Sequence, residues 1–173
     1  MYGKYLRAAL SAAMALSYMV PWMPGSADSS PPPPMPNIRL SDGSGIPFPI
    51  SRYAGNVLVI EFWSNACADC LTELTTLNRM QGDLPGKPVL AIAISEDDVT
   101  AQQIKQAMAR QKLTFLKPFG DPGGNAAQLM GLRGLPTSFV VDRHGRVVMQ
   151  LEGPQRWDRP DMEKRILYLA AQP

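Results

Sequence analysis

The sequence predicts an α/β fold with a mixed central sheet covered by helices on both faces. Two nearly continuous apolar runs, "VLVIEFW" at Val57–Trp63 and "PVLAIAI" at Pro88–Ile94, are typical of buried central strands. Segments with helical spacing of leucines alternate with these runs, and the chain closes with an antiparallel hairpin and a helix. Strands that alternate with helices indicate one α/β domain, which fits a length of 173 residues.

Residues 1–27 are predicted to be a signal peptide or an N-terminal anchor. Lys4 and Arg7 precede an uncharged, mostly apolar run from Ala8 to Val20, and "GSA" at residues 25–27 offers small residues for cleavage. A helix of the apolar length would rise only about 20 Å, less than the membrane core of about 30 Å. We expect cleavage for that reason. An uncleaved anchor remains the alternative, because no charge appears in the segment after Arg7.

The charge of the remaining chain excludes two classes of partner. Without Lys4 and Arg7, 15 basic and 15 acidic residues remain and the net charge is zero. This balance provides no electrostatic basis for binding nucleic acid or an anionic membrane. Export predicts a periplasmic location, soluble or N-terminally anchored, in which two cysteines oxidise unless a partner reduces them.

The rest of the chain is expected to divide into a linker, 28–37, and a domain, 38–173. Four consecutive prolines favour an extended polyproline conformation in the linker. The first helix of the domain is expected from Cys67 to about Met80, ended by Gly82, and "SEDD" at Ser95–Asp98 is expected to cap a second helix. The other elements are expected, in order, at 99–112 (this second helix), 113–119 (strand), 125–132 (helix), 137–142 and 147–153 (hairpin) and 158–171 (helix).

The two cysteines of the chain, Cys67 and Cys70, lie three positions apart. Structural zinc needs about four ligands, and the chain adds only His144, in the turn "RHGR", so no metal site is expected. A haem attachment motif needs histidine after Cys70, where Leu71 stands. A disulfide across three positions closes too small a loop to stabilise the fold much. The spacing therefore favours redox chemistry.

A redox role uses the position of the cysteines at the start of a helix. Backbone N–H groups and the helix dipole stabilise a thiolate on Cys67, and Cys70 lies one turn later on the same face. Cys67 is therefore the predicted nucleophile and Cys70 the predicted resolving thiol. A C-x-x-C motif between a strand and a helix is typical of this chemistry.

Two stretches carry a resemblance to a known family. "VLVIEFWSNACADCLTEL" resembles a thioredoxin-fold active site, and "GLRGLPTSFVVDRHGRVV" at Gly131–Val148 resembles the later motif in which a cis-proline faces the cysteines. From Ile38 to Ala171 the chain resembles the TlpA-like periplasmic thiol–disulfide oxidoreductases, which include thioredoxins of cytochrome c maturation. The resemblance implies a thioredoxin-like fold, with a cis Leu135–Pro136 bond and Pro136 shaping the substrate groove.

Two glutamates match acids of the family. Glu61 matches the buried acid beneath the second cysteine, where it would relay a proton to or from Cys70. The alternative is a glutamate at the pocket edge that only solubilises. Glu73 matches an acid common in TlpA-like sites. The alternative for Glu73 is an exposed helix carboxylate that interacts with the dipole.

Two positions depart from the family. Asp69 stands where the family has a proline-containing dipeptide, and its charge disfavours the Cys67 thiolate, which makes the pair more reducing. Ala66 replaces the usual tryptophan or other large residue, so a flatter surface is expected beside Cys67 although Trp63 is retained. The candidate substrate-binding residues are Trp63, Ala66, Asp69, Leu135 and Pro136.

Together these features predict an exported thiol–disulfide oxidoreductase, most simply a reductase of protein disulfides. No cofactor is expected, because the electrons arrive as thiols from a membrane protein, as the resemblance implies. A thiol oxidant is one alternative. A non-catalytic binding or metallochaperone module is another, since two thiolates can hold Cu(I). The substrate stays open among apocytochrome c, a copper-site assembly protein and a general pool of disulfides.

Overall fold

The computed structural model describes residues 30–42, 44, 46–121 and 123–173. The expected signal or anchor at 1–27 lies outside the described residues. Within them, no helix combines the length and apolar character needed to cross a membrane. Within the expected linker, Pro33 O accepts a hydrogen bond from Val147 N–H. That bond measures 2.9 Å, and Met35 N–H donates to Gly145 O at 2.8 Å.

A mixed five-stranded sheet forms the centre of the domain, in the order β5-β4-β3-β6-β7. The central strand β3 (Val57–Trp63) runs parallel to β4 (Val89–Ser95), which runs parallel to β5 (Lys117–Gly120). On the other side, β6 (Thr137–Val141) is antiparallel to β3, and β7 (Val147–Glu152) is antiparallel to β6. The predicted mixed sheet with a C-terminal hairpin is confirmed.

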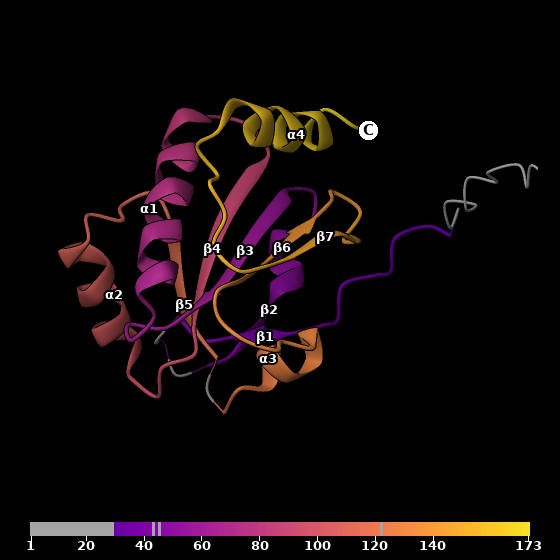
Figure 1. Cartoon of the computed structure of the whole chain (residues 1–173). Coiled ribbons are helices and arrows are strands. Elements are labelled where there is room, and N and C mark those ends of the chain that lie inside the picture. Colours follow the sequence, from indigo (N-terminus) through magenta and orange to yellow (C-terminus); the bar gives the residue numbers. More distant parts are fainter. Residues whose placement is uncertain (1–29, 43, 45, 122) are drawn as a thin grey trace, which may run out of the picture. The chain divides into compact units, whose positions relative to one another are not determined.

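Helices and small elements cover both faces of this sheet (Figure 1). One face packs against α1, α2 and α4, whose bounds are Ala68–Asp83, Ala101–Arg110 and Pro160–Ala170. The other face packs against α3, β1, β2 and the 3-10 helix η1, which span Asn125–Met130, Arg39–Leu40, Phe48–Pro49 and Ile50–Tyr53. The two apolar layers explain why β3 and β6 are buried throughout and β4 is buried except at Leu90.

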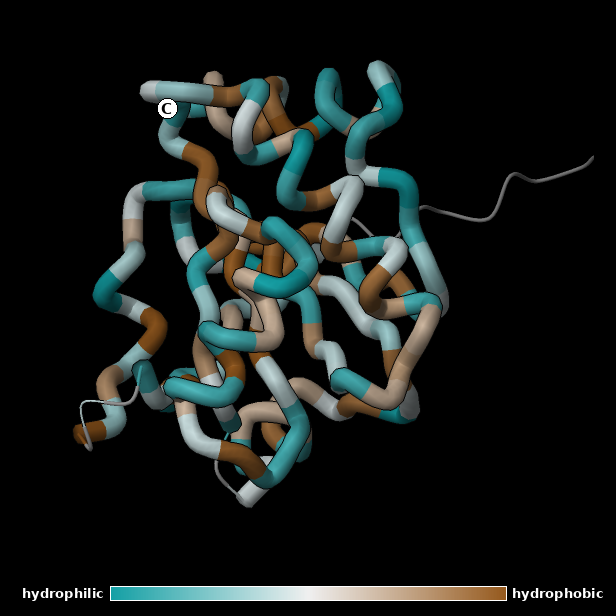
Figure 2. The backbone as a smooth tube through the Cα atoms, turned by 90° about the vertical axis from the view of Figure 1, so that its left-hand side faces the viewer, coloured by the Kyte–Doolittle hydropathy of each residue, from teal (hydrophilic) through white to brown (hydrophobic). Residues whose placement is uncertain are grey.

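Strand β3 divides its side chains between these two layers. Val57, Val59 and Trp63 belong to the layer of α1, whereas its even-numbered residues belong to the layer of α3. Figure 2 shows the hydrophobic stretches gathered in the centre of the domain. Because side chains alternate along a strand, Glu61 faces α1, in a layer made mostly of apolar side chains.

Two local expectations were wrong. Gly82 does not end α1, which continues to Asp83; a Cβ atom at Gly82 would lie 2.8 Å from the Phe115 ring, so the glycine serves close packing. The second helix is not capped by Ser95–Asp98. It starts after Thr100, whose side chain accepts from Gln103 N–H at 3.3 Å while the Gln103 side chain accepts from Thr100 N–H at 2.8 Å.

Candidate active site

Cys67 and Cys70 are joined by a disulfide at the start of α1, with their Cα atoms 5.3 Å apart. Cys67 is the N-cap of the helix, and Cys70 N–H donates to its sulfur at 3.1 Å. This N–H group and the helix dipole would also stabilise a Cys67 thiolate. The two sulfurs differ in access, because Cys67 is partly exposed and Cys70 is 0 % exposed.

The loop that leads into Cys67 is held by the carboxylate of Asp97, which lies two residues after the end of β4. Asp97 accepts from Ser64 Oγ at 2.6 Å, from Asn65 N–H at 2.9 Å and from Asn65 Nδ2 at 2.8 Å. Ser95 Oγ donates to the same carboxylate at 3.2 Å. Partial burial works to raise the pKa of Asp97, but these hydrogen bonds outweigh it and hold the pKa below its usual value.

Sequence reasoning missed Asp97, which it assigned to a helix cap. One feature of the sequence could have indicated its role: Asp97 directly follows a predicted buried strand, β4, which lies beside β3, the strand that leads to Cys67. Carboxyl ends of parallel strands meet at one edge of the sheet, where the cysteine loop also lies.

Glu73 lies on the inner face of α1, one turn after Cys70, and is 0 % exposed. Its carboxylate accepts from Ser138 Oγ at 2.6 Å, from Trp157 Nε1 at 2.8 Å and from Gln155 N–H at 3.0 Å. The alternative of an exposed helix carboxylate is therefore wrong. Burial raises the pKa of Glu73, and the three hydrogen bonds oppose that rise.

Glu61 is also 0 % exposed, but among the described residues neither of its carboxylate oxygens has a hydrogen-bond partner. It pairs across the sheet with Ser138 of β6 and with Ala93 of β4. Burial, and then the neighbouring charge of Glu73, raise the pKa of Glu61 well above its usual value. A glutamate at the pocket edge that only solubilises is excluded by this burial.

The Leu135–Pro136 peptide bond is cis, as the resemblance implies. The β3–β6 register pairs Phe62 with Thr137, so Pro136 lies at the level of Trp63, at the same end of the sheet as the cysteine loop. Leu135 is 37 % exposed. It borders a hollow of about 160 Å³, which Arg133, Gly134, Pro136, Thr137, Glu152 and Gly153 also line.

The other candidate residues differ in their exposure to solvent. Ala66 and Asp69 are exposed next to the disulfide. Trp63 is 0 % exposed and packs in the core, so its assignment to the substrate surface needs correction. His144 is exposed in the hairpin turn, and within the described part of the chain no three potential ligands gather for a metal ion.

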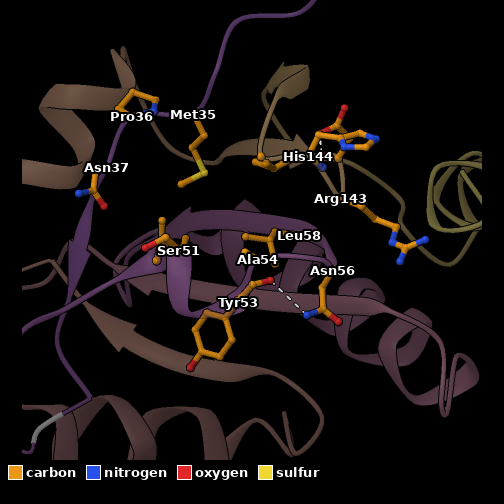
Figure 3. A pocket seen from close by; sticks show the side chains of 14 residues that line it. Met35, Pro36, Asn37, Ser51, Tyr53, Ala54, Asn56, Leu58, Arg143 and His144 are labelled. Atoms are coloured by element: carbon orange, nitrogen blue, oxygen red, sulfur yellow. Dashed lines mark hydrogen bonds between the residues drawn. The ribbon is translucent and has the colours of Figure 1, made fainter. Parts of the chain in front are cut away.

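A second hollow, of about 390 Å³, lies at the opposite end of the sheet (Figure 3). Figure 3 shows side chains of the N-terminal segment, η1 and the β6–β7 turn around it, among them Met35, Tyr53 and His144. Its lining also includes Leu58 near the start of β3, whereas Cys67 follows the end of that strand. This hollow is therefore separate from the disulfide.

Comparisons with known proteins agree with this geometry. The model of the AhpC/TSA family matches residues 33–150. The "Thiol-disulfide oxidoreductase ResA" of Bacillus thuringiensis is 28% identical over 120 residues, which cover 69% of this chain and 68% of the relative. The "Thiol:disulfide interchange protein HelX" of Rhodobacter capsulatus is 27% identical over 121 residues, 69% of this chain and 66% of HelX.

A solved structure extends the agreement to the fold. The putative thiol:disulfide interchange protein DsbE from Chlorobium tepidum superposes with a TM-score of 0.71 at 27% sequence identity. The superposition covers 82% of this chain and 99% of the other.

Proposed function

Because the chain belongs to the AhpC/TSA family and is a thiol–disulfide oxidoreductase with a thioredoxin-like fold, we propose that it reduces protein disulfides. In this proposal Cys67 is the nucleophile and Cys70 the resolving thiol. The observation that carries the assignment is the difference in access between the two sulfurs: Cys67 is partly exposed and Cys70 is buried. Only an accessible thiolate can reach a disulfide in another protein.

The exchange proceeds in two substitutions at sulfur. The Cys67 thiolate attacks one sulfur of the substrate disulfide, which breaks, and the other substrate sulfur leaves with the electron pair. Cys70 then loses its proton and attacks the Cys67 sulfur, which closes the Cys67–Cys70 disulfide and releases the second substrate thiolate. The substrate gains two electrons and the cysteine pair loses them.

In this proposal the direction of electron flow rests on Asp69. Its exposed position in the first turn of α1 puts a negative charge near the Cys67 sulfur. A less stable thiolate destabilises the reduced pair, which favours giving electrons to a substrate. Glu61, buried on the face of β3 that packs against α1, is the group we assign to receive the Cys70 proton.

The proposal extends to location and partners. The charged, apolar and small segments of residues 1–27 support export to the periplasm, where the chain is soluble or N-terminally anchored. An exported reductase needs electrons from a membrane protein that carries thiol equivalents across. Its substrates are protein disulfides, and those of a c-type apocytochrome are the first to test. The exposed surface around Ala66, Asp69 and Leu135 receives them.

A trapping experiment tests the roles of the two cysteines. The Cys70→Ser variant still attacks but cannot resolve, so it is expected to accumulate a mixed disulfide with its substrate. Cys67→Ser is the matched control and is expected to form none. Adducts are read on non-reducing gels and identified by mass spectrometry. Trapping by Cys67→Ser but not by Cys70→Ser would reverse the assignment.

A further inference from the structure

The charges of the folded domain are separated along the sheet, although those of the chain after residue 27 sum to zero. The loops after the carboxyl ends of β3, β4 and β5, with the first turn of α1, carry no lysine or arginine; their acids are Asp69, Glu96, Asp97, Asp98 and Asp121. Exposed bases gather at the opposite end of the sheet, called the far end: Lys87, Lys112, Arg146, Lys164 and Arg165. The net charge alone predicted no affinity for an anionic membrane, but that prediction treats the charges as evenly spread.

The far end is built from the β6–β7 turn, the loops before β4 and β5, and α4 (Figure 1). Lys87 lies in the loop before β4, and Lys112 shares a hollow with the last turn of α1. Arg165 of α4 shares a hollow with the start of β7. Arg143 in the β6–β7 turn donates to Gln172 O at 2.7 Å, so the C-terminal end of the chain is held there as well. The cysteines follow the other end of β3, so the length of the sheet separates them from these bases.

Some acids of the far end are engaged within it. Asp142 accepts from two backbone N–H groups of its own turn, each at 2.9 Å, and Asp161 pairs with Arg159 at 3.0 Å. Asp83 and Glu163 also lie there, but the bases of this end outnumber them. The far end therefore carries an excess of positive charge, and its field attracts anions that approach from that side.

Two exposed aromatic rings lie among these bases. Phe115, which is 57 % exposed, lies against Gly82 in the last turn of α1, and Tyr168 of α4 is 67 % exposed. Tyr168 follows Lys164 and Arg165 by one helical turn, so the three side chains share the outer face of α4. Tyrosine rings favour the boundary between lipid headgroups and hydrocarbon, and lysine and arginine are attracted to anionic headgroups. This combination fits the surface of an anionic bilayer.

The N-terminal segment enters the domain at the same end. Val147 N–H donates to Pro33 O at 2.9 Å, and Met35 N–H donates to Gly145 O at 2.8 Å, so residues 33–35 are bound to the β6–β7 turn and the start of β7. From Ala27, the last residue of the expected signal or anchor, to Pro33 the chain can span at most about 20 Å. A chain held in a membrane by residues 1–27 therefore keeps its far end within about this distance of the bilayer surface.

We propose that the far end, with the outer face of α4, docks on the surface of an anionic bilayer and holds Cys67 away from the membrane. The seven residues of β3 span about 23 Å, which sets the scale of the separation between the bilayer and the cysteine loop. A tether and a basic surface are each weak attachments, but together they hold a domain on a membrane. The proposal goes beyond the proposed function, because it concerns how the disulfide is presented and not the direction of electron flow.

Energy transfer on vesicles tests this orientation with the full chain. A fluorescent donor is attached to Cys67 in the Cys70→Ser variant, and an acceptor is carried by a lipid headgroup. We expect less transfer on vesicles that contain phosphatidylglycerol than on vesicles of phosphatidylcholine alone, because docking holds Cys67 away from the bilayer and an undocked domain turns freely on its tether. At about 1 M salt, where the Debye length is about 3 Å, the difference is expected to disappear.

Charge variants identify the docking surface. Lys164→Gln combined with Arg165→Gln is expected to lower the ratio of docked to undocked domains by about fivefold for each base, which raises transfer on the anionic vesicles. The matched control is Arg39→Gln combined with Lys105→Gln, which removes the same charge from β1 and α2, nearer the acidic end, and is expected to leave transfer unchanged. Without the Cys70→Ser substitution, both double variants are expected to reduce insulin at the wild-type rate.

Four results would overturn the proposal: equal transfer on the two kinds of vesicle, more transfer on the anionic vesicles, no association of the full chain with either kind, or equal effects of the two double variants. Binding of the far end to duplex DNA instead of anionic vesicles would assign its bases to nucleic acid and would overturn it as well. If the wild-type protein fails to reduce insulin, the proposed reductase function is wrong, whereas the transfer measurement still decides the orientation.

Discussion

An acidic residue lies on each side of the cysteine pair, and the two acids differ in their hydrogen bonding and in the direction of their pKa shifts. In front, Asp97 lies partly exposed and accepts from Ser64, Asn65 and Ser95, with its pKa below the usual value. Behind, Glu61 is fully buried without a partner among the described residues, and its pKa is raised. Asp97 is a fixed anion that organises a loop, whereas Glu61 is suited to exchange a proton.

This difference indicates that the number of hydrogen-bond donors, rather than the residue type, sets the role of an acid near a thiol. Hydrogen-bond donors keep a carboxylate ionised, and an ionised carboxylate can hold a loop in place through those hydrogen bonds. Removing donors and water makes the neutral form favourable, so the group becomes a proton store. Glu73 combines both conditions, since it is buried and has three donors.

The largest effect is expected from Asp97→Ala, which would break the anchor in front. It removes hydrogen bonds from Ser64, Asn65 and Ser95 to a charged acceptor, worth about 2–3 kcal/mol in total after replacement by water is allowed for. Urea unfolding of the oxidised protein measures the loss. Because the pKa of Asp97 is lowered in the fold, its contribution is present above the unfolded value of 3.8 and is lost as the pH falls through the folded pKa.

Asp98→Ala is the matched control, because Asp98 is the exposed neighbour of Asp97. It is expected to change stability by less than about 0.5 kcal/mol, as most surface substitutions do. Equal losses in the two variants would mean that Asp97 does not hold the loop. The role given to Asp97 in the comparison with Glu61 would then be wrong.

A smaller effect is expected from Glu96→Gln. Glu96 is an intermediate case between Asp97 and Glu61, because it is partly buried and its pKa is raised. Burial, then the charges of Asp121 and Asp97, raise the pKa of Glu96 to about 7. The folded state therefore binds more protons than the unfolded state, and stability falls as the pH rises from about 4.5 to about 7. The variant is expected to be more stable than the wild type at about pH 8, by roughly 1 kcal/mol after solvent screening of this half-exposed group.

The advantage of Glu96→Gln is expected to vanish near pH 4, where the wild-type carboxyl is protonated in both states. Thermal unfolding across this range measures it. An advantage that is independent of pH would point to packing rather than to charge, and Glu96 would not belong between the two cases.

Local pattern predicted most of the fold and half of the site. The apolar runs predicted β3 and β4, and the cysteine spacing together with the preceding strand predicted the start of α1. These signals work because burial and helix termini leave traces in neighbouring residues. Gly82 misled because its role depends on Phe115, a residue of a different segment.

The polar networks could not be predicted, because their members come together only in the folded chain. Glu73 meets Ser138, Gln155 and Trp157, which lie between 65 and 84 positions further along the chain. No local rule distinguishes such a glutamate from a solvated one at the same helical position. Asp97 was assigned to a cap for the same reason, since its partners Ser64 and Asn65 precede it by a whole helix and strand.

The reduction potential of the Cys67–Cys70 pair tests the central claim, that this chain is a reductase, most directly. Equilibration with glutathione buffers is expected to give a value of about −200 to −300 mV. Asp69→Asn is expected to raise it by about 20 mV, since a charge about 5 Å from the thiolate costs on the order of 1 kcal/mol. A wild-type potential near that of a strong periplasmic oxidant, about −120 mV, would contradict the account and make the protein an oxidant of thiols.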